Sequence, residues 1–355
     1  MSSAFDTIKR DNLINSLEGI IDEDELRMCH LLLSKTSIKL RFEDHPLEFF
    51  ETNVGSPQGD GISGTFFNVE LEQGLRELRK RLEEDARTSL PPEFEYADDT
   101  DFAFICNEKA KELKKIAKPT LAERNLFVND DKTEETNIFR ADEKEQEVWR
   151  KVKKLGSLLG DFEDLKRRQS LSIDEMKSVM DMFKKSKTGL PQKLKVYKSL
   201  VWHVLTYNYS TWGLSKTESE HLNRFHRKQL RRLCPSLKAK STEELYKACH
   251  SRPVSEDMKL ARWQMFGHAL RLPRDAPAQL AMDWYFEIPE IVNKFKGQAR
   301  ITLPTVLSKD IIAANKIKRL ETTQFVTSGD LFNLRGIAAD KIRWKGLVED
   351  ICGIV

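Results

Sequence analysis

Cysteine is scarce in this sequence, and long apolar runs are missing. The five cysteines are scattered through 355 residues without a CxxC pair, which excludes a disulfide framework and the common structural zinc motifs. The longest stretch without charge, residues 199–215, contains histidine, asparagine, serine and threonine and is too short and too polar to cross a membrane. The first ten residues hold no apolar signal core. These absences exclude a secreted disulfide-rich domain and predict an intracellular protein with no membrane segment.

The whole chain has almost no net charge, whereas its parts carry large net charges of opposite sign. Lys and Arg number 59 against 56 Asp and Glu, so the formal net charge is only +3. Residues 1–150, however, hold 21 basic and 34 acidic side chains, whereas residues 151–275 hold 27 basic and 13 acidic ones. Because 39% of the residues are hydrophobic, the chain has enough apolar surface to fold. An acidic first part followed by a basic second part suits metal binding beside nucleic-acid binding.

Hydrophobic periodicity divides the acidic part into short elements. Apolar side chains recur at steps of three and four in 66–84 and 108–124, which predicts helices. They alternate in 37–50 and 94–106, which predicts strands joined by turns. Leu126 and Val128 predict the start of one more strand. The first 160 residues therefore combine helices with antiparallel strands.

The basic part is predicted to be mostly helical. Capping boxes at 215–218 and 241–244 mark two helix starts. From about residue 287 the sequence shows proline and glycine punctuation without a readable period.

The acidic tip of the predicted 94–106 hairpin reads Tyr96-Ala97-Asp98-Asp99. Adjacent carboxylates on a turn are commonly a solvated surface feature. They also suit Mg²⁺, which takes oxygen ligands from one or two carboxylates and from substrate phosphates. Two such ions can bind the attacking and leaving oxygens of phosphoryl transfer. The tetrapeptide alone leaves both interpretations open.

Three neighbouring motifs bear on that choice. Residues 55–61 form a Gly-Ser-Pro-Gln-Gly loop in which small residues let a nucleotide or template approach the backbone. Residues 129–134 read NDDKTE, and residues 153–159 read KKLGSLL. Each has an ordinary structural explanation as a loop, a surface turn or a short strand. Their order along the chain is the informative property.

The ordered set SPQGD, YADD, NDDKTE and KKLGSLLGD resembles the reverse transcriptases of non-LTR (LINE-type) retrotransposons. Residues 1–8 are similar to the end of the first palm motif of this family. Residues 207–214 resemble the segment after the thumb helices, and 263–272 resemble the C-terminal WFGH pattern. The resemblance covers roughly residues 1–285.

The resemblance implies an α+β fold laid out as part of a right-hand polymerase. Residues 1–160 would be the palm with partial fingers, built on an antiparallel sheet and helices. Residues 161–275 would be a helical, basic, thumb-like and connecting region. Residues 276–355 would be a C-terminal region of unassigned role, in a mostly helical context.

The family's functional residues can be placed on matching positions. Asp98 and Asp99 would be metal-binding catalytic carboxylates for two Mg²⁺ ions, and Lys132 would be the acid near the leaving pyrophosphate. The substrate-binding positions are Phe5, Gln58, Gly59 and Tyr96. Residues 155–158, which include Gly156, match the segment that supports the primer end. The implied partners are an RNA template, a DNA primer and dNTP.

The first palm motif departs from the family pattern. In D-x-x-x-A-F-D, aligning Ala4-Phe5-Asp6 puts the metal-binding aspartate immediately before Met1, and the fingers segments that would precede it are missing. We therefore expect an N-terminally truncated copy whose polymerase activity is impaired. The alternatives are a noncatalytic nucleic-acid-binding protein on this scaffold and a helical interaction protein with a chance YADD turn.

A basic helix is the candidate nucleic-acid surface. Arg224, Arg227, Lys228 and Arg231 recur at helical spacing, so they share one side of a helix. Arg232, His221 and His226 cluster with them in the sequence. The alternative is a solvated helix face. Aromatic side chains at 202–212 are expected mainly in the core. A nuclear or cytoplasmic location follows from the resemblance alone, and the oligomeric state stays open.

Overall fold

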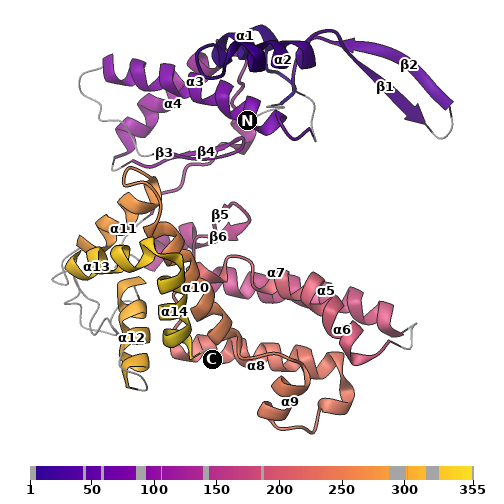
Figure 1. Cartoon of the computed structure of the whole chain (residues 1–355), viewed down its shortest axis with the longest axis vertical. Helices are drawn as coiled ribbons and strands as arrows, with labels where there is room; N and C mark the ends of the chain where they lie inside the picture. Colours follow the sequence, from indigo (N-terminus) through magenta and orange to yellow (C-terminus); the bar gives the residue numbers. More distant parts are fainter. Residues whose placement is uncertain are drawn as a thin grey trace. The chain divides into compact units, whose positions relative to one another are not determined.

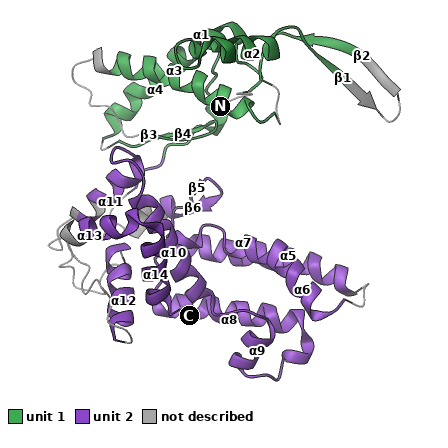
Figure 2. Ribbon diagram, in the orientation of Figure 1, with its two compact units in different colours: residues 1–135 green, residues 136–355 purple. Residues whose placement is uncertain are grey.

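The computed structural model describes residues 5–353, apart from 43–44, 57–59, 85–92, 105, 139–143, 185–187, 288–300, 302 and 317–327. The chain forms two compact units, residues 1–135 and residues 136–355 (Figure 2). Each unit has its own hydrophobic core. The described elements are mostly helices with small antiparallel sheets, so the predicted α+β class is confirmed.

Unit 1 combines helices with two hairpins. The helices are α1 (Arg10–Leu17), α2 (Glu23–Leu33), α3 (Ser63–Glu84), α4 (Asn107–Ala122) and η1 (Asp130–Lys132). The strands are β1 (Thr36–Phe42), β2 (His45–Thr52), β3 (Glu93–Tyr96) and β4 (Asp99–Phe102). The β1–β2 ribbon extends away from α1 and α2 (Figure 1). Its strands pair antiparallel, with Thr36 opposite Thr52 at its base.

The core of unit 1 follows the periodicity of α3. The side chains at 67, 71, 75, 78 and 82 are all buried, as their three- and four-residue spacing predicts. They pack with Leu113 and Leu121 of α4 and Leu13 of α1. The strand predicted at Leu126 and Val128 is wrong: these residues pack against the core in irregular backbone. The alternation of apolar and polar residues correctly indicated that these two side chains are buried. A strand also needs a neighbouring strand to pair with through backbone hydrogen bonds, and alternation does not provide one.

Unit 2 is mainly helical. Its first elements are η2 (Lys144–Lys151), β5 (Lys153–Lys154), β6 (Ser157–Leu158), α5 (Asp161–Lys184), α6 (Leu190–Val196), η3 (Tyr197–Trp202), α7 (His203–Leu205) and η4 (Tyr209–Thr211). The others are α8 (Lys216–Leu233), η5 (Pro235–Leu237), α9 (Thr242–Ala248), α10 (Val254–Leu270), α11 (Pro277–Glu287), α12 (Leu303–Asn315), α13 (Ser328–Ala339) and α14 (Lys341–Cys352). None of the described helices is long and apolar enough to span a membrane.

The capping boxes predicted for unit 2 are confirmed. The Ser215 hydroxyl accepts the Glu218 backbone N–H at 3.3 Å, and the Glu218 carboxylate accepts the Ser215 N–H at 2.7 Å. Ser241 and Glu244 repeat this exchange at the start of α9. Each box satisfies backbone donors that a helix leaves without intrahelical partners.

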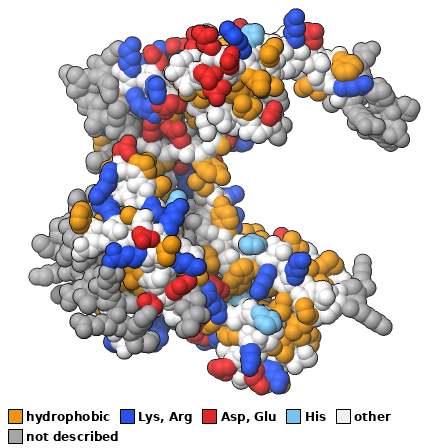
Figure 3. Space-filling view, viewed as in Figure 1, with side chains coloured by type: hydrophobic (Ala, Val, Ile, Leu, Met, Phe, Trp, Pro, Cys, Tyr) orange, Lys and Arg blue, Asp and Glu red, His pale blue; other side chains and the backbone are white. Residues whose placement is uncertain are grey.

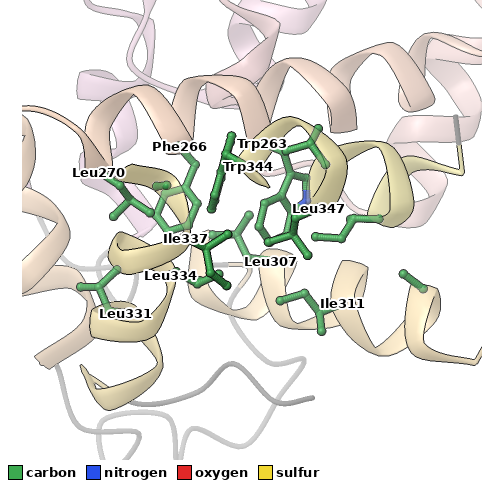
Figure 4. Packing of buried hydrophobic residues seen from close by; sticks show 14 of the residues in the cluster. Trp263, Phe266, Leu270, Leu307, Ile311, Leu331, Leu334, Ile337, Trp344 and Leu347 are labelled. Carbon is green, nitrogen blue, oxygen red and sulfur yellow. The ribbon is translucent and has the colours of Figure 1, made fainter. Parts of the chain in front are cut away.

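The helices after residue 276 pack on α10 around aromatic side chains. Trp344 of α14 lies beside Trp263 and Phe266 of α10, with ring centroids 6.0 and 6.1 Å away (Figure 4). The Trp263 indole also donates to Asp310 of α12 at 3.1 Å. The indole of Trp344 lies against Gly267, where an added Cβ would overlap it. This segment, without a readable period in the sequence, is thus part of the core of unit 2.

The contact between Gly267 and Trp344 gives a stability test. Gly267→Ala should lower the free energy of unfolding by about 2 kcal/mol or more, because the indole has to leave its packed position. Gly346→Ala is the matched control on α14, since a Cβ there meets nothing within 4 Å. It should raise stability by up to about 1 kcal/mol through helix propensity. Chemical denaturation measures both, and equal effects would contradict the packing argument.

Candidate active site

The first sequence motif and the loop before residue 57 lie side by side in unit 1. The Phe5 carbonyl accepts the Ser56 N–H, and the Ile8 carbonyl accepts the Gly55 N–H, both at 2.8 Å. The Phe5 ring packs on Phe67 of α3, with centroids 5.0 Å apart. The structure thus places Phe5 against the start of the SPQGD loop. The two predicted substrate-binding residues of this loop, Gln58 and Gly59, lie outside the described residues.

Gly55 is required at its position in this contact. Its φ is +81°, a left-handed conformation that glycine adopts without strain. An added Cβ would come within 2.9 Å of the Phe5 carbonyl oxygen. The glycine therefore permits the close approach of two backbone segments. This use differs from the one predicted for it, the approach of a nucleotide.

Arg10 joins these segments to the base of the β1–β2 ribbon. Its buried guanidinium donates to the carbonyls of Gly55 at 2.9 Å, Leu33 at 2.7 Å and Thr52 at 2.6 Å. It also donates to the Thr36 hydroxyl at 2.7 Å. Burial lowers the pKa of the Arg10 side chain. Sequence inspection missed this residue, because most of its partners are backbone carbonyls, which any residue type provides, and all of them are distant in sequence.

The predicted acidic hairpin is confirmed as β3 and β4. The strands pair Tyr96 with Asp99, which leaves Ala97 and Asp98 as a two-residue turn. Ala97 has φ +52°, a left-handed conformation typical of such tight turns but uncommon for residues with a side chain. Tyr96 is 68% exposed, Asp99 is exposed and Asp98 is half-buried. The hairpin tip thus carries a half-buried carboxylate in the turn and an exposed one at the start of β4.

The other face of β3 is fixed to α3 by an ionic network. Glu93 and Glu95 alternate with the exposed Phe94 and Tyr96, as the period of a strand requires. The Arg79 side chain donates to Glu93 at 2.8 Å and to Glu72 at 3.1 Å. Burial, followed by the nearby glutamates, raises the pKa of Glu95. This anchoring leaves the Tyr96 side of the hairpin facing solvent.

The donor atoms of Asp98 and Asp99 suit a divalent cation. Carboxylate oxygens are the ligands that Mg²⁺ prefers, and substrate phosphates and water commonly complete its shell. Within the part of the chain that the structure describes, no group of three or more His, Cys, Asp or Glu side chains could hold a metal ion. The role of these two aspartates as metal ligands stays a prediction.

Lys132 occupies a separate turn of unit 1. It ends η1, is exposed, and its backbone N–H bonds to the Asn129 side chain at 3.2 Å. The neighbouring Asp130 pairs with Lys118 of α4. The turn is thus held to α4 while the Lys132 side chain faces solvent. Its predicted role at the pyrophosphate stays a prediction.

Gly156 lies at the tip of the β5–β6 hairpin of unit 2. The two turn residues, Leu155 and Gly156, have φ of +45° and +83°, as a type I′ turn requires. An added Cβ on Gly156 would come within 3.3 Å of the Tyr207 hydroxyl. Glycine is therefore needed here for both conformation and space.

The candidate nucleic-acid helix is α8, which begins at Lys216. His221, Arg224, Lys228 and Arg232 are exposed along it. Arg227 is only 17% exposed and forms an ion pair with Glu220 at 2.7 Å. Arg231, half-buried, donates to the Lys240 carbonyl at 3.3 Å. Arg224 and Lys228 are thus the two predicted members most available to a phosphate.

His226, grouped by sequence with the basic residues of α8, does not belong to that surface. It is fully buried among the rings of Trp202, Tyr197 and Tyr246, at centroid distances of 4.8 to 6.2 Å. Burial, with a smaller contribution from Arg227, lowers its pKa to about 3. The surface prediction was wrong because helical spacing places position 226 among the buried residues of α8, with 222, 229 and 230.

The charged side chains are distributed differently between the two units. Asp and Glu gather on the face of unit 1 shown in Figure 3, in keeping with the excess of acids before residue 150. The basic α8 belongs to unit 2. The two candidate sites, carboxylates and cations, therefore lie on separately folded parts.

One family profile matches more than half of the chain. The family described as "Reverse transcriptase (RNA-dependent DNA polymerase)" matches residues 1–193. The chain belongs to the reverse transcriptase family. The match covers all of unit 1 and continues into α6 of unit 2. A search of curated proteins found no matching relative.

Family membership confirms the broad prediction from the motifs. Reverse transcriptases are RNA-directed DNA polymerases, whose substrates are a nucleic-acid template and primer and dNTP, and which generally use divalent metal ions. The matched range contains the YADD hairpin, the NDDKTE turn and the β5–β6 hairpin. The three-part division at residues 160 and 275 and the individual site residues stay predictions.

The buried His226 gives a pH test. Its folded pKa lies below the ordinary value of 6.5, so the unfolded chain binds a proton that the folded chain excludes. Above pH 6.5 the imidazole is neutral in both states, and burying it costs no stability through proton binding. Below pH 6.5 the free energy of unfolding decreases by about 1.4 kcal/mol for each pH unit, because the unfolded chain is protonated at His226 and the folded chain is not. Between pH 7 and 5, wild-type stability should therefore fall by up to about 2 kcal/mol more than that of His226→Phe.

Urea denaturation at several pH values measures this difference. His221→Phe is the control, because His221 is exposed on the same helix and should leave the pH dependence unchanged. Parallel curves for wild type and His226→Phe would contradict a neutral buried imidazole.

Proposed function

We propose that this chain is a reverse transcriptase segment of a non-LTR, LINE-type retrotransposon, and that Asp98 and Asp99 carry its metal-dependent chemistry. The observation that carries the proposal is the β3–β4 turn within the matched family range. It presents two adjacent carboxylates on a hairpin that α3 holds through Arg79. Retrotransposon type and metal identity are supported by the ordered sequence motifs.

Asp98 and Asp99 would hold Mg²⁺, which would neutralise charge on the transferring phosphates when bound. The protein's own contribution is positional. The two-residue turn fixes both carboxylates on one tip, and Phe5 and Phe102 pack against the same core. The exposed Tyr96 would face the incoming nucleotide or the primer. Lys132 would supply a proton or a positive charge to the pyrophosphate.

A second candidate function is noncatalytic binding of nucleic acid on this scaffold. The exposed cations of α8 favour it, because Arg224 and Lys228 would bind a phosphate backbone whether or not the carboxylates act. Metal-dependent synthesis separates the two candidates. Salt-dependent binding is expected of both.

A primer-extension assay with Mg²⁺ and an RNA template tests the first proposal. Asp98→Asn and Asp99→Asn should each lower extension on the order of 100-fold or more, since a lost metal ligand removes several kcal/mol of transition-state stabilisation. Asp101→Asn is the matched control, because it changes a carboxylate of the same hairpin outside the YADD motif. Equal loss in all three variants would point to hairpin damage. Extension that depends on neither Asp98 nor Asp99 would overturn the assignment of these carboxylates.

The basic face of α8 gives a binding test. Arg224→Gln with Lys228→Gln should weaken duplex binding at all sequences and reduce the slope of log K against log salt by about 2. Lys345→Gln is the control, since Lys345 is an exposed lysine on α14 and not on α8. Fluorescence anisotropy from 50 to 200 mM salt measures the slopes, and an unchanged slope in the double variant would exclude this face.

A further inference from the structure

Helix α2 exposes an apolar stripe on its solvent side. Cys29 and Leu33 of this helix are buried in the core of unit 1, whereas Met28, Leu31 and Leu32 are 64%, 73% and 55% exposed. Single exposed apolar side chains are ordinary on a protein surface, but these three lie within about one and a half turns of one helix. An apolar patch that continues along a helix is a candidate surface for contact with another protein.

The stripe has the spacing of a seam between two helices. Asp24, Met28, Leu31 and Lys35 follow one another at steps of four, three and four residues, the repeat by which helices pack in a coiled coil. Asp24 and Lys35 are exposed as well, and Lys35 lies two residues beyond the end of the helix. The seam therefore has an apolar middle with a carboxylate at one end and an ammonium group at the other.

This order of charges selects both the partner and its direction. When a second α2 runs antiparallel to the first, Met28 of each copy lies opposite Leu31 of the other, and Asp24 lies opposite Lys35. A parallel pair would instead place Asp24 against Asp24 and Lys35 against Lys35, and like charges in contact oppose association. A second copy of α2 thus complements the stripe in its apolar positions and in its charges.

The charge at the acidic end is available for such a contact. Asp24 pairs with Arg27 of its own helix at 3.4 Å, and both side chains are largely exposed. Ion pairs of this kind at a surface contribute little stability, so Asp24 can turn to a lysine of another copy at little cost.

We propose that α2 is the contact of a homodimer, in which two copies of the chain pair antiparallel through Met28, Leu31 and Leu32. The same residues contribute from both copies, as a twofold interface requires. Because the seam is only about three turns long, the dimer is small, and it forms and separates with protein concentration. The inference does not depend on the proposed function.

The proposed contact leaves the candidate carboxylates accessible. Helix α2 and the β3–β4 hairpin lie at opposite edges of unit 1 (Figure 1). Each copy in the dimer therefore keeps its Asp98 and Asp99 outside the contact.

Sedimentation equilibrium of residues 1–355 over a range of protein concentrations tests the proposal. The wild type should change from the mass of one chain toward twice that mass as the concentration rises. Met28→Gln and Leu31→Gln should each weaken dimerisation about 100-fold, because every dimer loses two buried apolar side chains. Glutamine is a good helix former, so the melting temperature of the dilute monomer should stay the same.

Ile342→Gln is the matched control for these variants. Ile342 is 84% exposed on α14 of unit 2, and the same change there should leave dimerisation unchanged. Equal weakening by Ile342→Gln and Leu31→Gln would indicate general apolar association and overturn the assignment to α2.

A charge exchange tests the antiparallel direction. Asp24→Lys and Lys35→Glu should each weaken the dimer about 10-fold, because two attractive pairs become repulsive ones. Together the two substitutions restore attractive pairs, so the double variant should dimerise within about threefold of the wild type. Damage to the helix would add up in the double variant and would give no recovery.

The remaining outcomes are decisive in the other direction. A folded chain that stays monomeric at every concentration overturns the proposal, and the stripe would then serve a different partner. A dimer that Leu31→Gln leaves intact also overturns it. A dimer that the double charge exchange fails to restore overturns the antiparallel pairing. Primer extension, present or absent, bears only on the proposed function.

Discussion

The buried guanidinium of Arg10 is the interaction on which unit 1 depends most. It takes a positive charge out of water without an ion pair to any carboxylate that the structure describes, which is costly unless every donor is used. The carbonyls of Leu33, Thr52 and Gly55 accept from Nη1 and Nε, while the Thr52 hydroxyl and the Val54 carbonyl accept from Nη2. Since these acceptors come from the end of α2, the end of β2 and the loop beyond it, one side chain fixes where three backbone segments meet. The contact of Phe5 with Ser56 lies at this junction.

Unit 2 solves a related problem with the opposite charge. The buried carboxylate of Asp164 is satisfied by a backbone N–H, an indole N–H and an arginine. In both units a buried ion organises backbone that has little regular structure of its own: a loop in one and a two-residue turn in the other. Such ions contribute specificity of conformation more than net stability. The candidate functional residues lie next to these organised segments.

The sequence predicted best the features that depend on local order. The spacing of apolar residues identified α3, the alternation around YADD identified the β3–β4 hairpin, and Ser215 and Ser241 identified helix starts. Arg10 and Asp164 were missed because their partners are distant in sequence or are main-chain groups. His226 was misassigned because composition drew it to its basic neighbours. Helix α14 was missed although its buried side chains, at 344, 347, 348 and 351, recur at steps of three and four.

The contact between Trp344 and Gly267 also constrains the order of events during synthesis. Trp263 and Phe266 of α10 are covered by a helix that begins 74 residues after Gly267, at Lys341. Their aromatic surface therefore stays open on the nascent chain until α14 leaves the ribosome. The described core of unit 1 is built from residues of unit 1, so this unit can fold earlier, as domains generally do from the N-terminus. The acidic part of this reverse transcriptase can thus fold while the aromatic surface of α10 is still uncovered.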